Sequence, residues 1–155
     1  VEGDVKDPKV LKNMDSLQIF IEKNEKVSVS FSVSDVVKQM HRTVMNDSVQ
    51  YEIIPDRRGM VNNLFTAYSI SGDSESFSSL VDYEYTNALI TAFSSAMSTE
   101  EVFSFIGKIS EYVQNNFFLL SGHPPFSFCQ NIDFSCFGHC NFSRKVSSCR
   151  KLCFW

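Results

Sequence analysis

The chain has 155 residues, of which 43% are hydrophobic and 14% aromatic, and its formal net charge is −4. This length and composition allow one domain with a hydrophobic core and exclude a chain that is mainly disordered. No basic stripe alternates with aromatic residues, so no nucleic-acid partner is expected, and no apolar run is long enough to span a membrane. The chain starts at Val1 without a basic and apolar leader, so we expect a processed product or fragment with a cytoplasmic location.

The first segment alternates between apolar and polar residues. Residues 1–13 are charged, lack a clear period and are expected to form a flexible leader. Residues 17–22 and 27–34 alternate, most clearly where valine and phenylalanine are interleaved with serine, and a short polar turn separates the two runs. This period of two predicts a β-hairpin with one face in solvent.

A helix is expected next, capped by Ser34 and ending near Asn46. Its apolar face includes His41, which is interpreted as a packed residue because no cysteine, serine or acidic partner lies at helical spacing. Residues 49–54 are a candidate strand. Residues 55–59 contain proline, a basic pair and glycine, which predicts an exposed turn, with a processing site as the alternative.

The central stretch is predicted to be a buried strand followed by two amphipathic helices. Residues 64–70 form a nearly continuous apolar run, as expected of a strand that is covered on both faces. Residues 71–76 are small and polar and predict a loop. Residues 82–97 repeat apolar side chains at the spacing of a helix face, and Asp82 is suited to start that helix.

The second amphipathic helix, over residues 99–115, has the clearest start signal in the chain. Ser98 and Glu101 have the spacing of a capping box. Residues 144–155 alternate again and predict a final strand that must pair with a sheet or with a partner chain. The expected core stripe of the second helix is Val102, Phe105, Ile106, Ile109 and Val113.

The cysteines and histidines do not form a recognisable chemical motif. All five cysteines lie between Cys129 and Cys153, and an odd number prevents complete internal pairing. His139 lies beside Cys140, but no Cys-x-x-Cys pair is present, so a zinc site is not favoured and no cofactor is expected. Catalysis by a cysteine–histidine pair is not favoured either, because the candidates lie in an irregular segment.

The order of these elements resembles the small subunit of caspases. Residues 64–70 contain Ala67-Tyr68-Ser69, which is similar to the core strand of that family, and two helices and a terminal aromatic strand follow. The ending, residues 150–155, is most similar to that of the catalytically incomplete caspase homologues of nematodes. The similarity covers about residues 56–118 and 144–155.

The resemblance implies an α/β fold, namely a caspase-like small-subunit half-domain. In this fold a short sheet is flanked by two amphipathic helices, and a C-terminal edge strand mediates dimerisation. The implied domain covers residues 55–155 with an insert at about 121–143. Residues 1–54 would be an N-terminal extension, a hairpin plus a helix, that the family does not explain.

The departures from the family indicate that the chain is not an enzyme. The family's catalytic cysteine and histidine motifs, which belong to the large subunit, do not occur here. Ungapped counting from Ala67 and Tyr68 places Phe77 and Ser78 where active caspases have a pocket-forming tryptophan and an arginine that pairs with the substrate aspartate. A serine hydroxyl cannot supply the charge of a guanidinium.

The resemblance therefore implies a non-catalytic caspase homologue that binds a caspase zymogen and restrains its autoactivation, which would regulate apoptosis negatively. Self-association is the other expected pairing, because the terminal strand of the family pairs across its dimer. One alternative is the separated small subunit of a cysteine protease that needs a large subunit for activity, and another is a structural zinc module. The expected partner-binding residues are Val146, Ser148, Arg150, Leu152 and Phe154.

Overall fold

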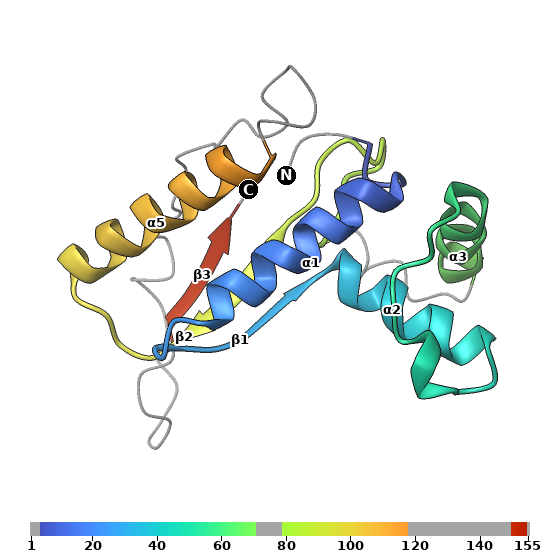
Figure 1. Ribbon diagram of the computed structural model, residues 1–155, viewed down its shortest axis with the longest axis horizontal. Helices are drawn as coiled ribbons and strands as arrows, with labels where there is room; N and C mark the ends of the chain where they lie inside the picture. Colours follow the sequence, from blue (N-terminus) through green and yellow to red (C-terminus); the bar gives the residue numbers. More distant parts are fainter. Residues whose placement is uncertain (1–3, 71–78, 118–149, 155) are drawn as a thin grey trace.

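The computed structural model describes residues 4–70, 79–117 and 150–154, and it is a mixed α/β structure (Figure 1). The expected insert, residues 121–143, lies entirely outside the described residues, as do residues 71–76, Phe77, Ser78, Val146 and Ser148. In chain order, the elements are α1 (Pro8–Glu22), β1 (Val27–Ser32), α2 (Val33–Val44), the short 3-10 helix η1 (Val49–Tyr51), α3 (Arg58–Ile70), β2 (Ile90–Ser94), α5 (Thr99–Phe117) and β3 (Arg150–Phe154).

The described strands form an antiparallel sheet in the order β1-β2-β3. Val29 of β1 stands opposite Phe93 of β2, and Ala92 of β2 stands opposite Leu152 of β3. Helix α1 lies over β1 and β2 and has α5 at its side, whereas α2, η1 and α3 lie beyond the end of the sheet (Figure 1). β2 is therefore the central described strand, and the two strands that pair with it, β1 and β3, come from distant parts of the chain.

One hydrophobic core joins the two parts of the chain that the sequence divided at residue 54. The core cluster extends from Val5 to Phe117 and includes side chains of α1, α2, α3, β2 and α5. Residues 27–32 pair with residues 90–94. In the described part of the chain, residues 1–54 thus supply strand β1 and the two helices α1 and α2 to the common core.

The hairpin expected from residues 17–22 is wrong, because these residues belong to α1. Asp7 caps this helix by accepting a hydrogen bond from the Lys9 amide, and Pro8 occupies the first turn, where its missing N–H costs nothing. The buried positions, Leu11, Met14, Leu17, Gln18 and Ile21, recur at helical spacing, whereas Ile19 is 54% exposed. The apparent alternation came from this exposed isoleucine.

The strands expected at residues 64–70 and 49–54 are also wrong. Residues 64–70 form the second half of α3, and residues 49–51 form η1. In α3, Leu64 and Phe65 are buried while Ile70 is 78% exposed, which is the one-sided pattern of a helix rather than of a strand covered on both faces.

The helix expected at residues 82–97 is replaced by a turn and β2. Val81 and Ala88 form an antiparallel bridge, and residues 90–94 form β2. Asp82 holds the intervening turn, because its carboxylate accepts hydrogen bonds from the backbone and side chains of Thr86 and Asn87. Tyr85 in this turn has φ of 59°, which a helix does not allow.

Several expectations are confirmed. Residues 27–32 form a strand, and residues 150–154 form a final strand that pairs with β2. Helix α5 starts at the expected capping box: the Ser98 amide donates to Glu101 Oε2 at 2.7 Å, and the Glu101 amide donates to Ser98 Oγ at 3.3 Å. Its stripe is buried at Val102, Phe105, Ile109 and Val113 and partly buried at Ile106. Helix α2 is confirmed with its cap at Ser32 instead of Ser34.

Candidate functional site

The two outer strands of the described sheet, β1 and β3, differ in the hydrogen bonds that are described at their outer edges. An edge strand presents unpaired N–H and C=O groups, and another strand can pair with them unless something covers them. β1 and β3 are at opposite ends of the strand order, so each has one edge that β2 does not use. The edges are the natural candidates for an interaction site, and their chemistry differs.

The outer edge of β1 is closed by two carboxylates of the same chain. The Ser30 amide donates to Glu22 Oε1 at 2.7 Å, and the Ser32 amide donates to Asp35 Oδ2 at 3.0 Å. Because these amides bond to side chains, they are the ones that point away from β2. Glu22 ends α1 and Asp35 lies in the first turn of α2, so two helices close the edge of the strand that joins them.

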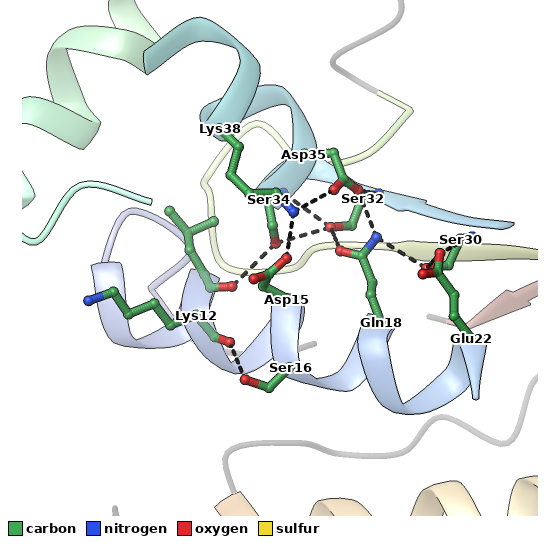
Figure 2. Close-up of polar contacts among 11 residues, drawn as sticks. Lys12, Asp15, Ser16, Gln18, Glu22, Ser30, Ser32, Ser34, Asp35 and Lys38 are labelled. Carbon is green, nitrogen blue, oxygen red and sulfur yellow. Dashed lines mark hydrogen bonds and ion pairs between the residues drawn. The ribbon is translucent and has the colours of Figure 1, made fainter. Parts of the chain in front are cut away.

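Gln18 lies between Asp35 and Glu22, and the Ser30 hydroxyl connects it to Glu22 by donating to Glu22 Oε1 at 2.8 Å (Figure 2). It is 4% exposed. Its Nε2 donates to Asp35 Oδ2 at 2.7 Å and to Ser30 Oγ at 3.3 Å, while Ser32 Oγ donates to Gln18 Oε1 at 2.5 Å. No fully buried side-chain nitrogen or oxygen of the described residues lacks a partner. We call Gln18, Glu22, Ser30, Ser32 and Asp35 the edge network.

Lys38 extends the edge network with a compensating charge. Its Nζ contacts Asp15 Oδ1 at 2.6 Å and Asp35 Oδ1 at 2.9 Å. Burial opposes the charge of Lys38, but its hydrogen bonds to Asp15 and Asp35 outweigh burial and raise its pKa above the ordinary value. A charged Lys38 is a hydrogen-bond donor and not a base, and the Ser32 hydroxyl donates to an amide carbonyl. The arrangement supports structure rather than nucleophilic chemistry.

The outer edge of β3 has no partner strand among the described residues, because β2 is the only described strand that pairs with β3. Arg150, Leu152 and Phe154 are three of the expected partner-binding residues, and they stand opposite Ser94, Ala92 and Ile90 in the sheet. The structure therefore brings these three positions together on one edge strand.

His41 is buried, as its interpretation as a packed residue implied. It is 5% exposed, its Nδ1 lies 2.8 Å from the Ile53 carbonyl oxygen, and the Tyr51 ring meets it edge-on with centroids 5.6 Å apart. Within residues 4–70, 79–117 and 150–154, no group of three or more histidine, cysteine or acidic side chains could hold a metal ion. His123, His139 and most of the cysteines are not among these residues.

The sequence interpretation did not find the edge network. One signal for it was present: Ser32 and Asp35 have the spacing of a capping box, and the structure confirms that box at the start of α2. The contributions of Gln18 and Glu22 could not be expected while residues 17–22 were interpreted as a strand.

Comparisons with protein-family models, with curated proteins and with solved structures found no match to this chain. Among the described helices, none has both the length and the apolar character that crossing a membrane requires.

Proposed function

We propose that the chain is a non-catalytic binding protein that adds strand β3 to a sheet of its partner. The observation that supports this proposal is the difference between the two edges. Carboxylates accept hydrogen bonds from the Ser30 and Ser32 amides of β1, while the outer edge of β3 has no described partner strand. Strand addition uses main-chain hydrogen bonds, so it needs an open edge more than a particular set of side chains.

We further propose that the partner is a caspase zymogen, whose autoactivation the bound chain restrains. The support for this partner is the resemblance of α5 and of the terminal run to the caspase small subunit. Residues 64–70 and 82–97 no longer contribute to it, because they do not have the strand and the helix that the family would require. A terminal strand that occupies the zymogen's dimerisation edge would block the productive dimer.

Zymogen self-cleavage in the presence of increasing amounts of this chain tests the proposal. We expect slower cleavage and recovery of the chain in a complex with the zymogen. Cleavage that is undiminished at excess chain contradicts the inhibitory role. Cleavage activity that appears only when a separate large subunit is added would instead support the alternative, the small subunit of a cysteine protease.

Proline substitutions test the edge itself, because proline removes a backbone N–H. Arg150→Pro and Lys151→Pro alter neighbouring β3 amides, one directed to each side of the strand. Of these two variants, we expect the one whose altered amide points away from β2 to abolish complex formation. The chain should keep its unfolding midpoint in that variant. The matched control is Ser28→Pro on β1, which we expect to leave complex formation unchanged. Loss of the complex in the control alone would show that the interaction uses the edge of β1 and not that of β3.

A further inference from the structure

Tyr83 differs from the other tyrosines of the chain in its exposure. All five tyrosines are among the described residues. Tyr83 is 97% exposed and makes no hydrogen bond or ring contact with another described residue. The others are partly buried, namely Tyr51, Tyr68, Tyr85 and Tyr112. Among the tyrosine hydroxyls, that of Tyr83 is therefore the one that another molecule reaches most readily.

Tyr83 lies in the turn that precedes β2, and hydrogen bonds fix the shape of this turn. The Asp82 carboxylate accepts hydrogen bonds from the Thr86 and Asn87 amides at 2.7 and 2.9 Å. The Asp82 amide in turn donates to the Asn87 carbonyl oxygen at 3.1 Å. The position of Tyr83 is therefore set by hydrogen bonds in which its own side chain takes no part.

Tyr85 anchors the same turn to the rest of the molecule. The Val5 amide donates to the Tyr85 carbonyl oxygen at 2.9 Å, and the Tyr85 ring meets the Phe65 ring edge-on with centroids 5.4 Å apart. Lys6 Nζ lies 3.6 Å from the centroid of the Tyr85 ring, which is a cation–π contact. These contacts hold one half of the turn against the fold, while Tyr83 is left in solvent.

Both sequence neighbours of Tyr83 are acidic. Burial opposes the charge of Asp82, but hydrogen bonds from Asn87 and Thr86 outweigh it and lower the pKa of Asp82 to about 2. The Asp82 carboxylate is therefore charged at neutral pH. Glu84 is exposed and forms no ion pair within the described ranges. An enzyme that selects its substrates by charge would meet an exposed hydroxyl between two carboxylates here.

We propose that Tyr83 is a phosphorylation site for an ATP-dependent tyrosine kinase with a basic substrate-binding surface. In this reaction the phenolic oxygen of Tyr83 forms a bond to the γ-phosphorus of ATP. The bond between the γ-phosphorus and the oxygen that bridges it to the β-phosphate breaks, and ADP leaves. The phenolic proton passes to the catalytic aspartate of the kinase.

The charge around Tyr83 also determines where the new phosphate would lie. Phosphorylation adds a charge of about −1.5 to −2 at neutral pH. Beside Asp82 and Glu84 this charge meets like charges and is not drawn toward the fold. The phosphate therefore stays in solvent, where arginine side chains of a partner can bind it. The site lies outside β3, so it does not depend on the proposed strand addition.

Incubation of the full chain with magnesium ATP and a tyrosine kinase catalytic domain that prefers acidic substrates tests the proposal. Peptide mapping by mass spectrometry then locates the phosphate. We expect Tyr83 to be modified at least about tenfold faster than any other tyrosine, because partly buried tyrosines need local opening first. Absence of phosphate at Tyr83, or faster modification of a partly buried tyrosine, would overturn the proposal.

Three variants sharpen this test. Tyr83→Phe should abolish incorporation and keep the unfolding midpoint, because the side chain is 97% exposed. Tyr51→Phe is the matched control, since it removes the same hydroxyl at a partly buried position, and it should leave incorporation unchanged. Glu84→Gln should slow incorporation about threefold or more. Undiminished incorporation in Tyr83→Phe would overturn the site, and an unchanged rate in Glu84→Gln would overturn its selection by charge.

Discussion

Replacement of Gln18 by glutamate is a direct test of the edge network. The change keeps the shape of the side chain but replaces the Nε2 donor by an oxygen. That oxygen would lie where Nε2 now lies, 2.7 Å from Asp35 Oδ2. Two carboxylates at this distance cannot both be ionised without strong repulsion, and the site is 4% exposed. We therefore expect Gln18→Glu to destabilise the fold at high pH.

The size of the effect follows from the pKa of the introduced carboxyl. Its ordinary value is about 4.3. Burial and Asp35 both raise it in the folded state. Burial beside a like charge typically raises a carboxyl pKa by about three units, which corresponds to a loss of about 4 kcal/mol at a pH above both values. The native state binds the extra proton more tightly than the unfolded state, so the loss develops as pH rises from the ordinary carboxyl pKa of about 4.3 through the raised folded-state pKa, and it is absent below that window.

Urea unfolding followed by circular dichroism at pH 4 and pH 8 measures this loss. Gln39→Glu is the matched control, because Gln39 lies on the exposed side of α2 and the change adds the same charge. We expect Gln18→Glu to be less stable than the control by about 4 kcal/mol at pH 8 and by much less at pH 4. Equal stability of the two variants at pH 8, or a difference that does not depend on pH, would refute the reasoning.

Two further predictions concern α5. Ile109 is 1% exposed in the core, so Ile109→Ala should lower the free energy of unfolding by about 2–5 kcal/mol, whereas Ile70→Ala, at a 78% exposed position, should change it little in the same urea titration. Hydrogen bonds from Lys26 and from the Ser98 amide lower the pKa of Glu101 to about 2. The stability that these hydrogen bonds give the fold is present above the ordinary carboxyl pKa and is lost as pH falls through about 2. An NMR titration of Glu101 should therefore show a midpoint at about 2. Lys26→Met should raise this midpoint. An unchanged midpoint in that variant would contradict the assignment of the cause.

The parts of the fold that the sequence predicted are those where local chemistry and burial agree. Helix α5 combines a capping box at Ser98 and Glu101 with a stripe that is buried in the structure. In β1 the residues do alternate between buried and exposed positions, but serines take the buried ones. Ser30 and Ser32 are buried as members of the edge network, while Val29 is 49% exposed. Polar side chains can be the inner row of a strand when a network satisfies them, which the pattern alone does not reveal.

The wrong predictions have identifiable physical causes. In α1 and α3, exposed isoleucines filled the gaps between buried positions, so Ile19 suggested alternation and Ile70 prolonged an apolar run. Residues 64–70 were then aligned with a caspase strand, which reinforced the error. In residues 82–97, apolar spacing favoured a helix, but the hydrogen bonds of Asp82 fix a turn and residues 90–94 join the sheet as its central described strand. Tertiary pairing decided that segment, and it involves strands far away in the sequence.

In the proposed strand addition, the hydrogen-bonded edge of β1 would limit how many copies or partners a single chain can join. A sheet with two open edges can add a strand at each, so units can join head to tail into an open-ended filament. Here Glu22 and Asp35 accept hydrogen bonds from the Ser30 and Ser32 amides of β1, so the proposed strand addition would proceed from β3. Two such sheets that met through β3 would form a closed pair with no further open edge among the described strands. In the proposed strand addition, the carboxylates of the edge network would therefore limit each chain to one partner.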